Sequence, residues 1–181
     1  IKKTIVTVGT FDGVHIGHQK IISQVVNTAK KKGLESILFT FDPHPRNVLL
    51  PESPMALIQT IEERATSLES MGLNHVVIHP FTKAFSKLSA QEYVESCLVE
   101  MLNIEEIVIG HNHRFGRNRV ADADELIQFG KLYDFKVTQI NAEELNDINI
   151  SSTKIREALI GGNIRIANSY LGNSFYLTGN I

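Results

Sequence analysis

Short apolar runs alternate with longer segments whose apolar residues recur every three or four positions, and this alternation defines the predicted elements. Five apolar runs rich in β-branched residues predict strands at residues 4–9, 36–41, 75–81, 106–110 and 135–140. Four amphipathic segments predict helices at residues 19–33, 60–72, 89–102 and 124–133. Capping boxes, in which a Ser or Thr pairs with a Glu three residues later, mark two helix starts, at Thr60/Glu63 and Ser89/Glu92.

Strands that alternate with helices of this length predict an α/β, Rossmann-like fold: a mostly parallel five-stranded sheet with helices on both faces. Ligands of such sheets bind beyond the carboxyl ends of the strands, where the strand order reverses. The stretches after the first, second and fourth predicted strands are polar or contain glycine, and their sequences are GTFDGVHIGH, FDPHP and GHNHRFG. We therefore expect the functional site at these three loops.

Composition narrows the class of protein without indicating a function. The chain has 181 residues, of which 43% are hydrophobic and 21% charged, and these values are typical of one globular domain. No apolar run approaches the roughly 20 residues that span a bilayer. A formal net charge of −2 gives no general attraction to nucleic acid, so an anionic ligand must be held by local groups. We expect neither a nucleic-acid partner nor a membrane partner.

Cysteine usage and the chain ends add expectations about location and extent. Cys97 is the single cysteine, which excludes an internal disulfide framework and a multi-cysteine metal site. Because no signal peptide precedes the first predicted strand, we expect a cytoplasmic protein. The sequence starts at Ile1 and stops on the strand-like FYLTGNI after a helix pattern, so we expect it to be an excerpt of a longer chain.

The loop after the first predicted strand combines three glycines with two histidines. Gly9, Gly13 and Gly17 are spaced four residues apart, and His15 and His18 stand in the tetrapeptide HIGH. The loop matches neither GxxxxGK[ST] nor GxGxxG, but glycines let backbone approach a ligand, and the amides that start the next helix bind anions. Two alternatives remain. The histidines could ligate a metal, although no third ligand lies at a helical interval, or they could be ordinary surface residues.

A second polar stretch, NISSTKIREAL at residues 149–159, places hydroxyl groups before a short helix pattern. These hydroxyls precede two cations, and the residues are Ser151, Ser152, Thr153, Lys154 and Arg156. Taken alone, the stretch is an N-capped helix with a solvated basic face. Taken with the first loop, it supplies hydroxyls, free helix amides and a guanidinium, which are the groups that bind a polyphosphate.

Four motifs in order resemble a known family. HIGH with the late ISSTKIR is similar to the nucleotidylyltransferase superfamily, a signature shared loosely with class I aminoacyl-tRNA synthetases. VGTFDGVHIGH, TFDPHP (40–45), IGHNHRFG (109–116) and ISSTKIR (150–156) together resemble the FMN adenylyltransferase module of bacterial bifunctional riboflavin kinase/FAD synthetases. The chain departs from that pattern at Asn112, His113 and Ala121, where relatives often carry Asp, an aromatic residue and Gly.

The resemblance implies both a domain division and a reaction. It covers residues 4 to about 160, and it implies an FMN adenylyltransferase domain at 1–160. Residues 161–181 would be a linker and the start of a truncated riboflavin kinase domain, which would be the covalent C-terminal partner in the full-length protein. The implied reaction joins ATP and FMN to give FAD and pyrophosphate. Mg²⁺ would come with ATP, held by phosphate oxygens and water rather than by a dedicated protein site.

The resemblance also implies roles for residues of the four motifs. The catalytic residues would be His15, His18 and Arg156. ATP would be bound by Gly9, Thr10, Phe11, Asp12, Gly13, His15, His18, Ser151, Ser152, Thr153 and Arg156, with Lys154 a further candidate. The flavin would be bound by Phe41, Pro43, His44, Pro45, Asn112 and Phe115.

Several of these residues keep a second interpretation. Asp12 could contact the water shell of Mg²⁺ or satisfy its own turn, and FDPHP could be a wall for the flavin or only a rigid turn. Three arginines near the end of the fourth strand could lie near the FMN phosphate or in a mobile basic loop: Arg114, Arg117 and Arg119. We expect structural roles for three further residues, namely His75 and His79 beside a buried strand and Cys97 on an amphipathic helix.

Rival functions differ in the acceptor or in the absence of turnover. Another superfamily member would transfer a nucleotide to nicotinamide mononucleotide, phosphopantetheine or glycerol 3-phosphate, and only TFDPHP and GHNHRFG argue against it. A non-catalytic flavin or nucleotide binding module has little need for the polyphosphate-binding groups of ISSTKIR. A class I synthetase fits least, because 181 residues leave no room for a tRNA-binding domain and KMSKS is absent.

Overall fold

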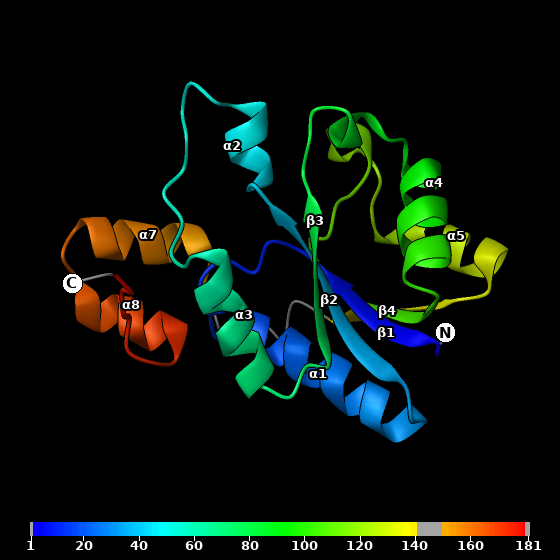
Figure 1. Ribbon diagram of the computed structural model, residues 1–181, viewed down its shortest axis with the longest axis horizontal. Helices are drawn as coiled ribbons and strands as arrows, with labels where there is room; N and C mark the ends of the chain where they lie inside the picture. Colours follow the sequence, from blue (N-terminus) through cyan, green and yellow to red (C-terminus); the bar gives the residue numbers. More distant parts are fainter. Residues whose placement is uncertain (1, 141–149, 180–181) are drawn as a thin grey trace.

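Five parallel strands form one sheet at the centre of the computed structural model, which describes residues 2–140 and 150–179. The strands are β1 (Thr4–Val8), β2 (Glu35–Asp42), β3 (His75–Pro80), β4 (Ile104–Gly110) and β5 (Lys136–Ile140). Their order in the sheet is β3-β2-β1-β4-β5, and every neighbouring pair is parallel (Figure 1). The predicted α/β class and all five predicted strands are confirmed. The strand order reverses between β1 and β4, which is where a ligand is expected in such a sheet.

Helices cover both faces of this sheet. They are α1 (Ile16–Lys32), α2 (Pro45–Leu49), α3 (Ile61–Ser70), α4 (Ala90–Tyr93), α5 (Ala123–Tyr133), α7 (Ser152–Ile160) and α8 (Ile164–Leu171), with short 3-10 turns η1 (Phe85–Lys87) and η3 (Arg117–Arg119). The segment after α4 continues as a π-helix, η2 (Val94–Met101). Helices α1 and α3 pack on one face, and α4, η2 and α5 pack on the other (Figure 1). Both predicted capping boxes are formed, at the starts of α3 and α4.

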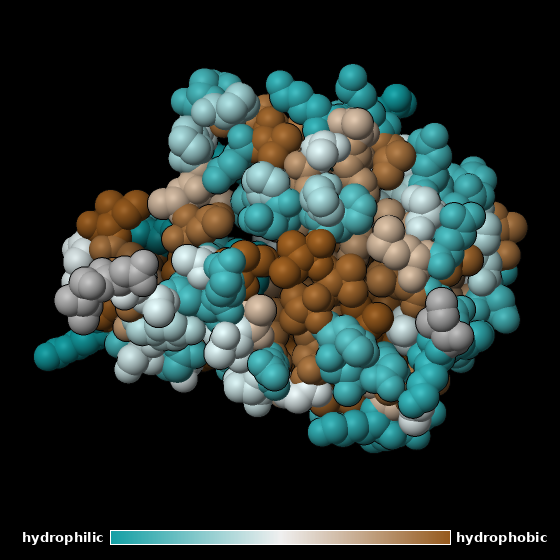
Figure 2. All heavy atoms as spheres, in the orientation of Figure 1, coloured by the Kyte–Doolittle hydropathy of each residue, from teal (hydrophilic) through white to brown (hydrophobic). Residues whose placement is uncertain are grey.

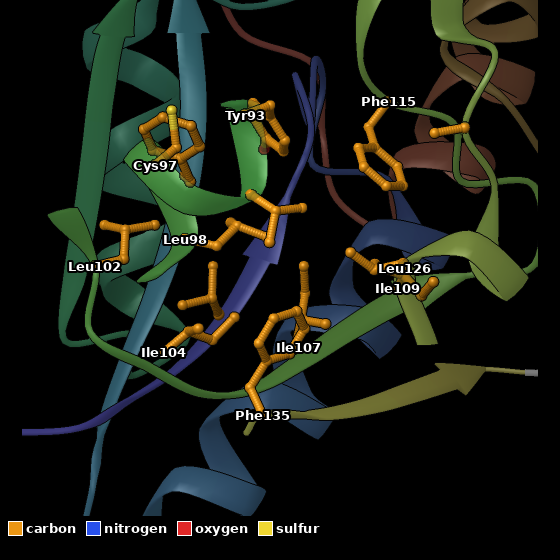
Figure 3. Packing of buried hydrophobic residues seen from close by; sticks show 14 of the residues in the cluster. Tyr93, Cys97, Leu98, Leu102, Ile104, Ile107, Ile109, Phe115, Leu126 and Phe135 are labelled. Atoms are coloured by element: carbon orange, nitrogen blue, oxygen red, sulfur yellow. The ribbon is translucent and has the colours of Figure 1, made fainter. Parts of the chain in front are cut away.

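Each strand divides its side chains between two apolar clusters, one on each face. Adjacent residues of β1 show this directly, because Ile5 belongs to the cluster under α1 and Val6 to the cluster under η2 and α5. Cys97 lies in the second cluster and is 2% exposed, which confirms its expected core position. Figure 3 shows Tyr93 and Phe115 together at one end of that cluster and Phe135 at the other end. The aromatic end lies toward the carboxyl edge of the sheet.

Strand β3 differs from the prediction that it is buried. It occupies an edge of the sheet, none of its residues is fully buried, and Ile78 is 44% exposed. Hydrophobic side chains gather in Figure 2 over the region where β3 lies in Figure 1, bordered by hydrophilic ones. An edge strand pairs with one neighbouring strand instead of two, so its side chains are more exposed to solvent. The apolar residues of the sequence do not show whether a strand lies at the edge or in the middle of the sheet.

The C-terminal helices form a third apolar cluster beside the first loop. Ile155 of α7 packs with Leu171 of α8, and the two helices lie side by side in Figure 1. The amide of Gln19 donates to Val14 O at 2.9 Å and to Leu171 O at 2.8 Å, so α8 is tied to the loop that precedes α1. The stretch expected as a strand is irregular over its described residues 175–179. Thr178 donates its backbone N–H to Glu63 Oε1 over 3.1 Å.

In the part of the chain that the structure describes, none of the helices combines the length and the apolar character that crossing a bilayer requires.

Candidate functional site

A cavity of about 840 Å³ opens at the carboxyl edge of the sheet, where the sequence predicts the site. It is walled by the loops after β1, β2 and β4, by residues around η1 and α4, and by the start of α7. Its lining includes twelve of the expected site residues: Gly9, Thr10, Phe11, His15, His18, Phe41, His44, Pro45, Asn112, Phe115, Ser151 and Ser152. The other expected residues lie outside the lining, and these are Asp12, Gly13, Pro43, Thr153 and Arg156. Three loops and one helix start, far apart in the sequence, therefore share one space.

The loop after β1 holds two bulky residues in the left-handed backbone region. Phe11 has φ 49° and Val14 has φ 39°, a conformation that β-branched residues rarely adopt. Such residues cost on the order of 1–3 kcal/mol each and cluster at functional sites. Both side chains are buried, at 4% and 3% exposure, and this packing offsets the strain. Gly13 has φ 84°, and an added Cβ would meet Ile58 at 3.0 Å, so glycine is required there.

His15 is fixed as the N-cap of α1, and this contact sets the position of its proton. Its Nδ1 accepts the backbone N–H of His18 at 3.3 Å, which assigns the ring proton to Nε2. Burial lowers the pKa of His15 to about 4. At pH 7 the ring is neutral, and its Nε2–H remains available as a donor. His15 therefore ends the loop and can also donate a hydrogen bond to a ligand.

His18 stacks on His15 and is neutral as well. The ring centroids are 3.6 Å apart with 16° between the planes, and His18 also contacts the ring of Phe11 at 4.5 Å. Burial lowers the pKa of His18 well below its usual value, and repulsion by His15 in its protonated form and by Arg64 lowers it further. Its Nδ1 is buried without a hydrogen-bond partner. The histidine pair thus offers neutral N–H donors rather than two fixed positive charges.

Asp12 is buried at the centre of a charged network rather than exposed to the cavity. Its carboxylate, 1% exposed, accepts the backbone N–H groups of Ile58 and Gln59 at 3.0 and 3.2 Å. Arg156 donates to its Oδ2 at 2.8 Å, and Nη2 of Arg64 lies 3.9 Å from its Oδ1. Of the two interpretations of Asp12, these contacts favour the structural one, although its neighbours are two cations rather than its own turn.

The late motif forms the start of α7 as the sequence predicts. Ser151 is the N-cap, and its Oγ accepts the N–H of Lys154 at 3.3 Å. The hydroxyl of Ser152 donates to Asp12 O at 2.8 Å, which joins the first motif to the last one in the sequence. Thr153 is exposed and lies outside the lining of the cavity. The helix start and the strand-end loop therefore meet through Ser152 and Arg156.

The other end of the cavity is aromatic. Phe41 lies 5.6 Å from Phe81 and 5.5 Å from Phe85 between ring centroids, and Tyr93 lies 5.8 Å from Phe115. All five rings line the cavity. The hydroxyl of Tyr93 is buried without a partner, and burial raises its pKa well above the usual value. Phe81, Phe85 and Tyr93 were not predicted as site residues. Phe81 and Tyr93 belong to apolar patterns that are typical of core, and Phe85 lies between two predicted elements.

The loop after β4 is held by contacts on both of its sides. Phe115 exchanges backbone hydrogen bonds with Ala121 at 3.1 and 3.3 Å, and His113 stacks on its ring at 5.9 Å. Burial, together with the charge of Arg119, lowers the pKa of His113 to about 4. Arg114 pairs with Asp122 at 3.2 Å. Asn112 is exposed and lines the cavity, so its amide is available to a ligand.

The FDPHP stretch turns the chain into α2 at the mouth of the cavity. His44 is the N-cap, its Nδ1 accepts the N–H of Arg46 at 3.2 Å, and Pro45 begins the helix. Burial is the main cause of the lowered pKa of His44. His44 and Pro45 line the cavity, while Pro43 does not. The stretch is both a rigid turn and part of the wall.

Within 2–140 and 150–179, no group of three or more His, Cys, Asp or Glu is arranged to hold a metal ion.

Comparisons with known proteins agree with the motifs. A family model described as FAD synthetase matches residues 1–154. A bifunctional riboflavin kinase/FMN adenylyltransferase of Buchnera aphidicola subsp. Schizaphis graminum (strain Sg) is 34% identical over 97% of this chain and 57% of its own length. The protein of the same name from Escherichia coli (strain K12) is 29% identical over 98% of this chain and 56% of its own length. The chain therefore spans little more than half the length of these relatives.

A solved structure agrees in fold. The crystal structure of a protein described as a macrolide-efflux protein from Streptococcus pneumoniae superposes with a TM-score of 0.84 and 27% identity. The match covers 97% of this chain and 66% of the other. The α/β architecture described above is thus shared over nearly the whole chain.

Proposed function

Since the chain belongs to the FAD synthetase family, we propose that it transfers AMP from ATP to FMN, giving FAD and pyrophosphate. The observation that carries this proposal is the division of one cavity into two chemically different ends. Histidine N–H groups and the hydroxyls that start α7 lie at one end, and five aromatic rings lie at the other. A triphosphate suits the first end, and a flat flavin ring suits the second.

The reaction needs no protein nucleophile. A phosphate oxygen of FMN attacks the α-phosphorus of ATP in line, a new P–O bond forms, and the bond to the bridging oxygen of the β-phosphate breaks. The electron pair leaves with pyrophosphate. Because the attacking phosphate is already ionised at neutral pH, catalysis rests on positioning and on stabilising charge in the transition state.

His15 and His18 would stabilise that transition state as neutral donors. The cap contact of His15 leaves its Nε2–H free, and the stacking of His18 on the same ring gives both groups a fixed orientation. Preorganised donors of this kind need no reorientation when charge develops on the phosphoryl oxygens. Gly9, Thr10 and Phe11 would bring backbone close to the phosphates in the same wall.

The start of α7 would bind the leaving pyrophosphate. Ser151 and Ser152 line the cavity, and Arg156 lies four residues beyond Ser152, on the same side of the helix. A guanidinium can make a bidentate contact to phosphate. Thr153 would take part only through its backbone or after a rotation of its side chain, since its residue is exposed outside the lining.

The flavin ring would lie among the aromatic residues. Phe41 and Phe115 were expected there from the motifs, and Phe81, Phe85 and Tyr93 complete the wall. Asn112 could hydrogen-bond the polar edge of the flavin, and His44 and Pro45 would close the side near α2. The sequence suggested three arginines as neighbours of the FMN phosphate. Arg114 and Arg119 line the cavity, and Arg117 does not.

Mg²⁺ would enter with ATP, bound to phosphate oxygens and water. The acidic group in the loop after β1 is Asp12, and its oxygens are occupied by two backbone N–H groups and by Arg156. This supports a role for the ion as part of the nucleotide substrate, where it neutralises charge on the triphosphate.

The domain division also remains a proposal. We place the adenylyltransferase at 1–160, and a riboflavin kinase domain would follow in the full-length protein, as the names of the relatives suggest. Helix α8, just beyond this boundary, contacts Ile155 and Gln19, so the proposed linker begins as a helix packed on the first domain. We also propose a cytoplasmic location, which cell fractionation would test.

The decisive experiment incubates the chain with Mg-ATP and a panel of phosphorylated acceptors. We expect pyrophosphate release and a product of the mass of FAD only when FMN is present. Turnover with nicotinamide mononucleotide or phosphopantetheine but not with FMN would show that the acceptor is not FMN. Binding of ATP and FMN without pyrophosphate release would instead indicate a binding module.

A further inference from the structure

Arg64 is a buried cation beneath the loop after β1, and no motif points to it. Its side chain is 2% exposed, and among the residues that the structure describes it is the largest fully buried side chain. Nη1 donates to Thr10 O at 2.7 Å, while Nη2 lies 3.9 Å from Asp12 Oδ1. Burying a guanidinium without such partners would cost a large free energy of desolvation. Arg64 is therefore held in place by its contacts with the loop after β1.

Asp12 transmits this arrangement to α7. Its carboxylate accepts two backbone N–H groups, from Ile58 and Gln59, and Nη1 of Arg156 at 2.8 Å. The side chain of Arg156 is 15% exposed, compared with 2% for Asp12. Arg156 is therefore the member of the network that is open to solvent, and the other two hold it from beneath.

Two guanidinium groups contact the carboxylate of Asp12 beside a helix N-terminus and two serine hydroxyls, and Asp42 is a further carboxylate that acts on Arg64 from a longer distance. Arg156 is the partly exposed cation of this set, so it is the member that a polyphosphate can reach. An arginine that is already oriented loses less conformational freedom when the ligand binds.

We propose that Asp12 and Arg64 are positioning residues that act through Arg156. Arg156 itself lies outside the lining of the cavity, but Asp12 holds its guanidinium beside the loop after β1, where Ser152 of the cavity wall also contacts Asp12. The triphosphate of the proposed reaction would therefore meet an oriented donor. This inference rests on the proposed function for the identity of the ligand. Asp12 does not contact ATP or Mg²⁺ in this arrangement.

The test is a double-mutant cycle read by ligand affinity. The variants are Asp12→Asn, Arg156→Gln and the double variant, and Asp12→Asn keeps the size of the side chain. Binding of the non-cleavable α,β-methylene analogue of ATP, with Mg²⁺, is measured by calorimetry, and FMN binding by quenching of its fluorescence. We expect each single variant to lower the affinity for the analogue about tenfold. The double variant should bind the analogue no more weakly than Arg156→Gln alone. FMN affinity should not change.

Two further variants separate positioning from loss of folding. Arg64→Lys keeps the charge but cannot hold Thr10 O and Asp12 together, and it should weaken the analogue while leaving FMN binding intact. The matched control is Glu106→Gln, because Glu106 is also a buried carboxylate, 2% exposed, paired with Lys32 at 2.8 Å, and lies outside the cavity. It should lower thermal stability without changing either affinity. If Asp12→Asn does not fold, the cycle is run with Arg64→Lys in its place.

The outcomes distinguish this inference from the proposed function. Additive losses in the double variant, or equal losses of FMN affinity, overturn the positioning role even when the wild-type protein makes FAD. A wild-type protein that binds the analogue but does not adenylylate FMN fails the proposed function, while a non-additive cycle still supports the network. Failure of the wild type to bind the analogue overturns both.

Discussion

At its polar end the cavity is walled by backbone, two stacked histidines and a helix N-terminus, and buried charges hold these parts in place. At its aromatic end the wall consists of rings that touch mainly one another. The polar end comes from two continuous stretches of sequence, whereas the aromatic rings come from β2, the segment after β3, α4 and the loop after β4. One end is thus organised by hydrogen bonds and the other by packing, so variants should separate into effects on ATP and effects on flavin.

The largest effect is expected from His18→Ala at the polar end. Removing one preorganised donor to the transition state should lower kcat for FAD formation about 100- to 1,000-fold, with a much smaller change in ATP affinity. Steady-state rates and calorimetric ATP binding measure the two quantities. The control is His18→Asn, which keeps an N–H donor and should lose less. Unchanged turnover in His18→Ala would remove this residue from the mechanism.

At the aromatic end, Phe41→Ala should lower the affinity for FMN and leave the affinity for ATP unchanged. A lost ring contact is worth about 1–3 kcal/mol, which corresponds to a decrease in FMN affinity of roughly 5- to 150-fold. Fluorescence quenching of FMN measures it. Phe129 packs against the same core cluster but does not line the cavity, so Phe129→Ala should lower stability and leave FMN affinity unchanged. Equal effects of both variants on FMN would mean that Phe41 acts only through folding.

A smaller effect is expected from Tyr93→Phe. The hydroxyl of Tyr93 is buried without a partner, and removing such a group should raise the free energy of unfolding by about 1 kcal/mol. Urea denaturation of the ligand-free protein measures this change. A decrease in stability would show that the hydroxyl has a partner. A simultaneous loss of FMN affinity would indicate that the flavin is that partner, which would add a polar contact to the aromatic end.

The smallest effect concerns pH. Burial lowers the pKa of His113 to about 4, whereas an unfolded histidine titrates near 6.5. Between these values the unfolded state binds more protons, so stability present above pH 6.5 is lost as the pH falls toward 4. From pH 7 to 6 we expect His113 to contribute a loss of about 0.7 kcal/mol. His113→Phe should reduce the loss seen in urea denaturation at the two pH values.

His15, at the polar end, has a pKa lowered to about 4 by the same cause and would keep its own contribution in that variant. A pH dependence that is identical in wild type and His113→Phe would assign the effect to the other histidines whose pKa burial lowers, His15, His18 and His44.

The sequence allowed the strands, the main helices and three of the cavity walls to be predicted, because each depends on a local pattern. Strand periodicity and the capping boxes at Thr60 and Ser89 are visible within a few residues. The exposure of β3 and the packing of α8 on Gln19 depend on which elements become neighbours. Gln19 and Leu171 are 152 positions apart, and β3 pairs with β2 across the intervening chain, so no local pattern encodes either contact.

Arg64 and Tyr93 differ in how far the sequence alone could have indicated their roles. Arg64 stands three residues after Ile61 and four before Leu68, on the apolar side of α3, and a charged residue at such a position was a usable signal. Tyr93 continues the apolar side of a predicted helix, and nothing local distinguishes it from a core residue. A polar residue on an apolar face can be noticed in a sequence, but an aromatic residue at a cavity wall cannot be told from one in the core.

The stacked rings of His15 and His18 give the protein a spectroscopic reporter of its own. Each imidazole lies within the ring current of the other, at 3.6 Å between centroids, and the cap contact of His15 keeps its proton on Nε2. Their carbon-bound protons should therefore resonate far from those of the other histidines in an NMR spectrum. A nucleotide that moves either ring would shift both signals together, so ligand arrival could be followed without a label and without turnover.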